Sequence, residues 1–151
     1  MTNLPLLNYA DLKDLSAYDL VIHFGGLYAG GVKGLKSTVK ALPEGAKLMI
    51  VTVGLADVSD QDNIRNIRNS LKKQVPEALL KNASIFHLRG GIDYRKLNFK
   101  HKAMMTLLYN KARHLPEDQK TAEVKAMIET FNSTVDFVDF ESLTPILEVI
   151  R

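Results

Sequence analysis

The feature that most restricts the fold is an apolar run that ends in glycine. Residues 20–24 are almost entirely apolar, which is typical of a strand covered on both faces by helices. Four glycines follow closely, at Gly25, Gly26, Gly30 and Gly31. Glycine lets a backbone turn sharply or approach a ligand. With the helical spacing over 31–42, the pattern predicts a strand at 18–24, a glycine-rich loop and a helix.

The same order occurs twice more along the chain. The apolar run 47–53 is closed by Gly54, and the run 84–89 is followed at once by Gly90 and Gly91. Helical patterns over 61–74 and 77–80 separate the two runs. Alternating strands and helices predict an α/β fold whose three strands are parallel neighbours. Right-handed crossovers then bring the three glycine loops to one edge of the sheet, where ligands of such folds bind.

The remaining segments predict edges and helices. Leu4–Leu7 is short and contains Pro5, which is typical of an edge strand or an extended lead-in. Further predicted elements are a turn at 11–15, helices at 96–112, 117–131 and 142–150, and an extended segment at 135–138. We expect one domain over 1–151.

Composition excludes several classes of function. The chain has 151 residues and a net charge of +3. It contains no cysteine, so disulfides and thiolate chemistry are excluded. We expect a cytoplasmic protein, because neither a signal peptide nor a membrane span is recognisable. The basic residues are spread out without an aromatic platform, so no nucleic-acid partner is expected. His87, His101 and His114 have no metal-ligand spacing, and no residues are assigned to catalysis or to a metal.

Three stretches of the sequence resemble the flavodoxins and, more narrowly, the flavodoxin-domain family that includes the oxygen-independent protoporphyrinogen oxidases. Residues 18–30 (YDLVIHFGGLYAG) resemble the third strand and its loop. Residues 48–56 resemble the fourth strand and loop, and residues 86–94 (FHLRGGIDY) resemble the fifth. Residues 95–112 match the basic, methionine-rich insertion of the oxidase branch. The resemblance covers roughly residues 3–150.

The resemblance implies a three-layer, flavodoxin-like sandwich that binds FMN, with a mostly parallel sheet of order 2-1-3-4-5. The flavin ring would lie between residues 26–30 and 54–57. Tyr28 would cover the ring, or it is an exposed turn aromatic. Backbone amides at 54–56 would face the pyrimidine edge, and 89–91 would line the far side. The expected cofactor-binding residues are Gly25, Gly26, Leu27, Tyr28, Ala29, Gly30, Val53, Gly54, Leu55, Ala56, Asp57, Arg89, Gly90 and Gly91.

The sequence departs from the family at its start. The family opens with a strand, a Ser/Thr-rich phosphate loop and a helix, and this sequence has no S/T-x-T-G-x-T-like run. We interpret it as a truncated gene product, or else as a relic with a different sheet order. The first strand and helix would then be absent and FMN would bind weakly or not at all. Strand 19–24 would have a bare edge, to be covered by Leu4–Leu7 or by another chain.

Two functions follow as hypotheses. The first is a redox protein that uses non-covalent FMN for electron transfer or substrate oxidation, with a redox partner protein or a small hydrophobic substrate. The second is a truncated or non-catalytic module that acts through protein interaction. Segment 96–113 would lie on a membrane or partner, or pack its methionines on the core. Asp57 and Asp60 are loop acids or helix caps, and His23 is interpreted as a satisfied interior residue.

Overall fold

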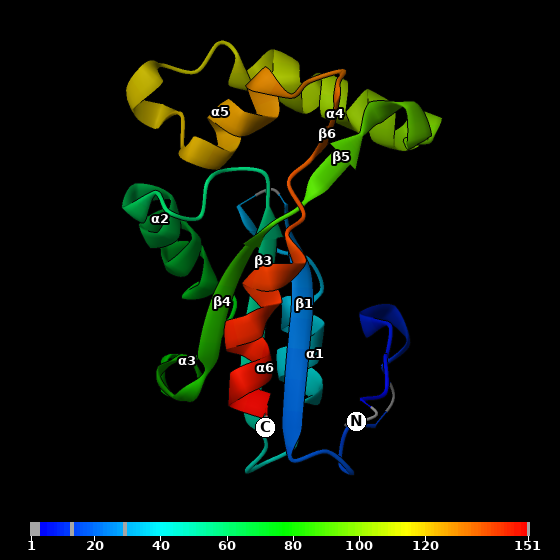
Figure 1. Cartoon of the computed structure of the whole chain (residues 1–151), viewed down its shortest axis with the longest axis vertical. Helices are drawn as coiled ribbons and strands as arrows, with labels where there is room; N and C mark the ends of the chain where they lie inside the picture. The colour runs from blue at the N-terminus through cyan, green and yellow to red at the C-terminus, as the bar shows by residue number, and fades with distance from the viewer. Residues whose placement is uncertain (1–3, 13, 29, 151) are drawn as a thin grey trace. The chain divides into compact units, whose positions relative to one another are not determined.

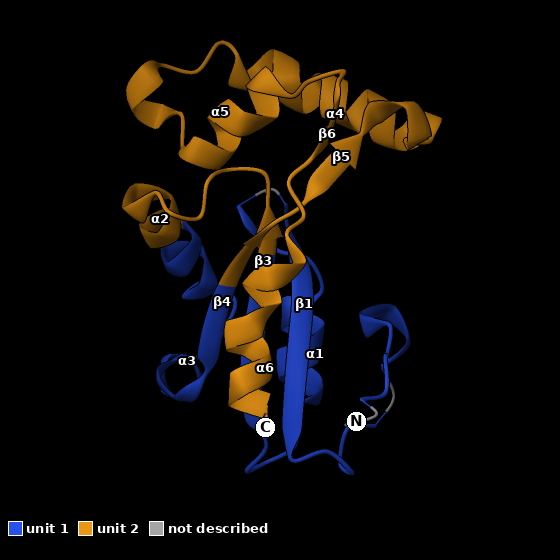
Figure 2. Cartoon of the chain, in the orientation of Figure 1, with its two compact units in different colours: residues 1–52, 67–86 blue, residues 53–66, 87–151 orange. Residues whose placement is uncertain are grey.

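The computed structural model describes residues 4–12, 14–28 and 30–150 and divides the chain into two compact units. Unit 1 is formed by residues 1–52 and 67–86, and unit 2 by residues 53–66 and 87–151 (Figure 2). The expected single domain over 1–151 stays a prediction.

Unit 1 holds the first strands and helices of the chain (Figure 1). Its complete elements are the 3-10 turn Tyr9–Asp11, β1 (Leu20–Tyr28), β2 (Gly31–Val32), α1 (Leu35–Ala41) and α3 (Glu77–Asn82). Three more elements begin in one unit and end in the other, namely β3 (Lys47–Gly54), α2 (Gln61–Leu71) and β4 (Ser84–Arg89).

One sheet has the strand order β2-β1-β3-β4. Figure 1 shows β1, β3 and β4 running in the same direction, while β2 pairs antiparallel with the end of β1, with Leu27 opposite Val32 and Tyr28 opposite Gly31. The predicted α/β class, flavodoxin-like with a mostly parallel sheet, is confirmed. The strands β1, β3 and β4, which the sequence predicts as neighbours, lie next to one another in this order.

The core of unit 1 lies against β3. Leu35 of α1 and Leu71 of α2 join the alternate β3 residues Leu48 and Ile50 in one buried cluster. Each such apolar side chain contributes about 1.5–3 kcal/mol when it is removed from water. Residues 49 and 51 alternate to the opposite face and are also fully buried. Both faces of β3 are therefore covered, as the unbroken apolar run predicts.

Unit 2 contains the rest of the chain. Its complete elements are β5 (Gly91–Asp93), α4 (Phe99–Ala112), α5 (Ala122–Glu129), β6 (Thr134–Asp136), α6 (Thr144–Ile150) and 3-10 turns at Tyr94–Lys96, Glu117–Gln119 and Phe140–Leu143. β5 and β6 pair antiparallel as a second, two-stranded sheet. Phe131 stacks on Tyr109 at 4.0 Å between ring centroids and meets Tyr94 edge-on at 5.4 Å. These rings form an aromatic cluster in this unit.

The strand β1 is longer than predicted. It continues through Gly25 and Gly26 to Tyr28, so these glycines lie in a strand rather than in a loop. A Cβ added to Gly25 would lie 2.3 Å from the Val32 side chain and 3.0 Å from the Lys33 carbonyl oxygen. Glycine is thus needed for β2 to fold back on β1. Phe24 is 52% exposed, so the expected coverage of both faces is wrong at this end.

The predicted helix over 31–42 is shorter than expected. Gly31 and Val32 form β2, and α1 begins only at Leu35. Gly34 has a left-handed φ of 78°, and a Cβ placed there would meet the Tyr9 ring at 2.4 Å. The helix therefore starts after a position that only glycine fills easily. The helix predicted over 117–131 is similarly divided into a 3-10 turn and α5.

The predicted pairing of Leu4–Leu7 with β1 is wrong. The neighbours of β1 are β2 and β3, and Leu6 is 99% exposed. Pro5 has no N–H to donate to a ladder, which disfavours pairing. On the β2 side, no strand of the described chain lies beside residues 20–25, so the bare edge expected from the sequence is present there.

His23 is an interior residue whose two ring nitrogens both have partners. Nε2 lies 3.0 Å from the Lys33 carbonyl oxygen and therefore donates to it, and Nδ1 lies 2.8 Å from the Thr38 hydroxyl, from which it accepts. This arrangement uses the neutral ring. Burial lowers the pKa of His23, and the hydrogen bond to Lys33 opposes part of that effect. The interpretation of His23 as a satisfied interior residue is confirmed.

The lowered pKa of His23 predicts a loss of stability in acid. As the pH falls below the ordinary histidine value of 6.5, the unfolded chain takes up the proton before the folded chain does, so folding is progressively disfavoured. Stability is complete above that value and is lost as the pH falls towards the lowered pKa. Urea unfolding at several pH values should show this slope for wild type and His114→Gln, and a weaker slope for His23→Gln. Equal slopes for all three would contradict the assignment.

Candidate functional site

The expected flavin loops are distributed over the two units. Residues 25–28 and Gly30 belong to unit 1, whereas residues 53–57 and 89–91 belong to unit 2. Ala29 lies outside the described residues. Within unit 2 the structure brings together the loops after β3 and β4.

The ends of β3 and β4 touch through their glycines. The Gly90 N–H donates to the Gly54 carbonyl oxygen at 2.8 Å. A Cβ on Gly90 would lie 2.7 Å from the Val53 side chain, so glycine lets the two strand ends approach. This close approach fixes where the loop over residues 54–57 begins.

Arg89 fastens this loop from one side. Its Nη2 and Nε both donate to the Leu55 carbonyl oxygen, at 2.7 and 3.1 Å. The guanidinium carbon lies 3.8 Å from the centroid of the Phe137 ring, which is a cation–π contact. Arg89 is the last residue of β4, so strand position and side-chain contacts together hold the loop.

Glu123 holds the loop from α5. Its Oε1 accepts from the Leu55 N–H at 2.8 Å and its Oε2 accepts from the Ala56 N–H at 3.0 Å. These are two of the amides expected to face a flavin. The sequence interpretation missed Glu123, because Glu123 lies 68 positions after Leu55 and 67 after Ala56. No local sequence pattern indicates a contact over such a separation.

Asp57 and Asp60 act as turn and helix caps. Asp60 Oδ1 accepts from the backbone N–H groups of Asp62 and Asn63, at 2.8 and 3.2 Å, at the start of α2. Asp57 Oδ1 accepts from the N–H and hydroxyl of Ser59. These bonds hold the pKa of Asp57 below its usual value, and the charge of Arg89 adds to the effect. Capping, one of the two alternatives, is the role that these hydrogen bonds support.

The first glycine-rich segment, in unit 1, leaves room at its tip. Gly30 has a φ of +79°, and a Cβ there would meet no atom within 4 Å. Tyr28 is 43% exposed, and Leu27 packs against the core cluster. The role of Tyr28 as a flavin cover stays a prediction.

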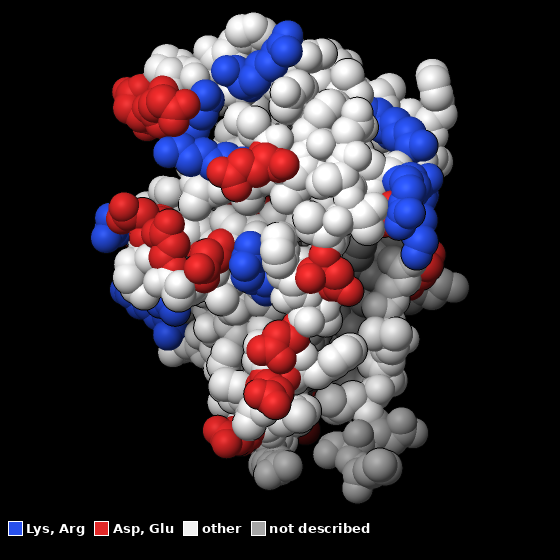
Figure 3. Space-filling view, turned by 45° about the horizontal axis from the view of Figure 1, so that its top comes forward, with Lys and Arg blue, Asp and Glu red and all other residues white. Residues whose placement is uncertain are grey.

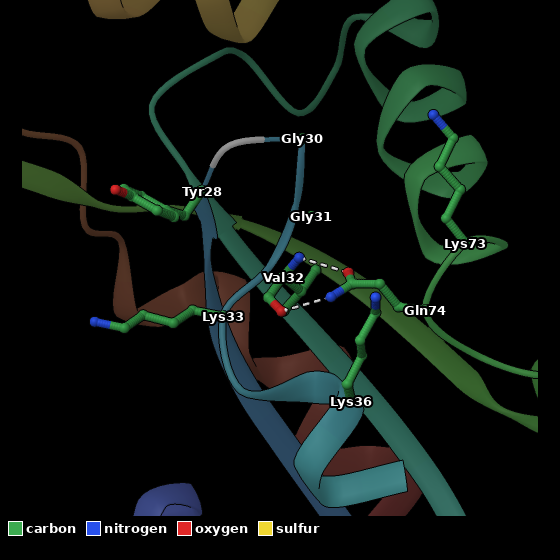
Figure 4. Close-up of a pocket in the computed structure, with 8 residues that line it drawn as sticks. All are labelled: Tyr28, Gly30, Gly31, Val32, Lys33, Lys36, Lys73 and Gln74. Carbon is green, nitrogen blue, oxygen red and sulfur yellow. Dashed lines mark hydrogen bonds between the residues drawn. The ribbon is translucent and has the colours of Figure 1, made fainter. Parts of the chain in front are cut away.

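A shallow pocket of about 380 Å³ opens beside this segment (Figure 4). Its lining is Tyr28, Gly30, Gly31, Val32, Lys33, Lys36, Lys73 and Gln74. Among the described residues, none of the three lysines is in an ion pair, so this part of unit 1 attracts anions. Figure 3 shows basic and acidic side chains interspersed on the visible face, in keeping with the small net charge.

Gln74 closes the outer edge of β2 at this pocket. The Val32 N–H donates to Gln74 Oε1 at 2.7 Å, and Gln74 Nε2 donates to the Val32 carbonyl oxygen at 3.0 Å (Figure 4). The side-chain amide thus pairs with the edge as a neighbouring strand would. Because Val32 is 2% exposed, water cannot easily replace these bonds.

Segment 96–113 is mostly the helix α4. Phe99 and Leu107 are 88% and 72% exposed, whereas Met104 and Met105 are half-buried and α4 contacts α5. The half-buried methionines agree with the packing interpretation, whereas contact of the segment with a membrane or partner stays a prediction.

The comparisons with known proteins identify a family. A model of the flavodoxin domain family matches residues 3–119, well over half of the chain. The chain belongs to the flavodoxin domain family. The match ends before α5, so it is shorter than the resemblance over roughly 3–150. No curated protein and no solved structure matches the chain.

Residues 4–12, 14–28 and 30–150 contain no group of three His, Asp or Glu side chains placed to hold a metal ion. None of the helices described is long and apolar enough to cross a membrane.

Replacement of Gln74 should destabilise unit 1. Gln74→Ala leaves a buried N–H and a buried carbonyl of Val32 without partners, which costs about 1–3 kcal/mol. Urea unfolding measures the change. Gln61→Ala is the matched control, because Gln61 is exposed and its amide has only a 3.5 Å contact. Equal unfolding free energies for Gln74→Ala and wild type would refute the role of Gln74.

Replacement of Arg89 should loosen the loop in unit 2. Lysine at 89 cannot make the planar two-donor contact with Leu55 or stack as well on Phe137, so Arg89→Lys should lower the free energy of unfolding by about 1–2 kcal/mol. Arg113→Lys is the control, since its guanidinium lies 5.7 Å from the Tyr109 ring. A larger effect at Arg113 than at Arg89 would contradict this assignment.

Proposed function

We propose that this domain binds FMN non-covalently and uses it for electron transfer or for oxidation of a substrate, in the manner of a protoporphyrinogen oxidase. One observation carries the proposal: the amides of Leu55 and Ala56 lie side by side and both bind acceptor oxygens of one planar group. The pyrimidine edge of a flavin is also planar and presents acceptors. The donor pair therefore fits this edge of FMN.

Several residues of unit 2 would each make a different contact with the flavin ring. Leu55 and Ala56 would donate to the pyrimidine edge, while Arg89 would keep the Leu55 carbonyl turned away from the ligand. Gly90 and Gly91 would line the far side of the ring, as the resemblance implies. When bound, FMN supplies the one- and two-electron chemistry, and the protein positions it.

A non-catalytic module that acts through protein interaction is the second candidate function. It is favoured by the finding that a carboxylate already satisfies both amides. The exposed side chains of Phe99 and Phe140, at 88% and 79%, offer apolar contact area. In this alternative, FMN binds weakly or not at all.

The partners of the domain are part of the proposal. A redox partner protein or a small hydrophobic substrate would suit FMN chemistry. Contact with an anionic membrane surface through 96–113 would use the lysines and the exposed apolar side chains of α4, which are spread around the helix rather than gathered on one face. The open edge of β1 suits pairing with a second copy, as a homodimer.

A flavin titration tests the proposed function. We expect FMN fluorescence to change on binding with a dissociation constant on the order of 10–100 µM, since the ring edge supplies hydrogen bonds while the family's phosphate loop has no counterpart in this sequence. Riboflavin, which lacks the phosphate, should bind within about threefold of FMN. The absence of any change at roughly millimolar protein would favour the second candidate. Submicromolar binding of FMN alone would show that a phosphate site exists.

A further inference from the structure

We propose that Glu123 is a built-in competitor of the flavin ring, and that the ring binds only when the Glu123 side chain leaves the loop. The inference rests on the proposed function, because it concerns the same amides. All of its residues lie in unit 2. It names a residue that sets the affinity of the site and that the family match over 3–119 does not include.

The geometry makes the competition direct. The two carboxylate oxygens lie 2.8 and 3.0 Å from two successive backbone nitrogens. Each oxygen has its own N–H, so no donor of this pair is left over for a ligand. Ala56 is buried at 4% exposure, which leaves little room for a second acceptor beside the carboxylate. A planar acceptor group must therefore replace Glu123 and cannot join it.

The helix that carries Glu123 does not need this contact to form. The first turn of α5 is capped by Thr121, whose hydroxyl accepts from the Val124 N–H at 3.3 Å. The Lys125 N–H also donates to the Thr121 carbonyl oxygen at 3.0 Å. A long glutamate side chain can thus turn into water, where a carboxylate is well solvated, while its helix stays in place.

The loop also keeps a second fastening when Glu123 leaves. Arg89 holds the Leu55 carbonyl oxygen through two donors, and Asp57 organises the next turn through Ser59. The two amides would then be presented on a loop that is still ordered. The arrangement fits a site whose donors are kept satisfied until an uncharged planar ligand takes them.

Riboflavin is the probe for this inference, because it carries the flavin ring without the phosphate. Glu123→Ala should bind riboflavin at least about tenfold more tightly than wild type, which corresponds to 1.4 kcal/mol. Glu123→Gln, which keeps the side-chain size but only one acceptor oxygen, should lie between them. Glu129→Ala is the matched control on the same helix, since Glu129 is exposed, and it should bind like wild type.

Hydrogen exchange gives a second readout that does not depend on redox activity. Without ligand, the Leu55 and Ala56 amides should exchange faster in Glu123→Ala than in wild type, and riboflavin should slow them again. If wild type binds riboflavin and neither Glu123 variant binds it more tightly, this inference is overturned and the proposed function stands. If no form of the chain binds riboflavin, both are overturned. If Glu123→Ala does not fold, Glu123→Gln decides by the same comparison.

Discussion

The loop after β3 depends on two side chains, one that binds a carbonyl oxygen and one that binds N–H groups. Arg89 binds the carbonyl oxygen of Leu55, and Glu123 binds the N–H groups of Leu55 and Ala56. A loop has no ladder partner of its own, and buried backbone groups without partners are costly. The same contacts that stabilise the loop also determine which of its groups a ligand can reach. The Glu123 carboxylate therefore both stabilises the loop and occupies the amides that are proposed to bind the flavin.

The glycines of this chain serve packing before they serve a ligand. Gly25 admits the Val32 side chain, and Gly90 admits that of Val53. An added Cβ on Gly91 would lie 2.6 Å from the Val135 carbonyl oxygen. In contrast, Gly26 and Gly30 border open space, which leaves them available for close approach by a ligand. A glycine-rich stretch after a strand can therefore indicate either close packing or a ligand site, and the structure shows which glycines serve packing.

The sequence was sufficient for the buried strands and insufficient for the contacts between distant residues. β3 and β4 were predicted almost to the residue, because an unbroken apolar run bounded by glycine leaves few alternatives. The two-residue strand β2 was missed, since Gly31 and Val32 have no periodicity and pair only because Gly25 lets them approach. Leu4–Leu7 was given a partner that it does not have. Glu123 was missed because its partners lie far away in the sequence.

We propose that the Leu55 and Ala56 amides receive the flavin ring, and an amide NMR titration with riboflavin tests this assignment directly. We expect these two ¹⁵N–¹H signals to shift most and in parallel as flavin is added, while a reference amide such as Leu79 in α3 stays fixed. A shift of the signals around the lysine-lined pocket, such as those of Gly31 and Gln74, with Leu55 and Ala56 unchanged, would contradict the assignment.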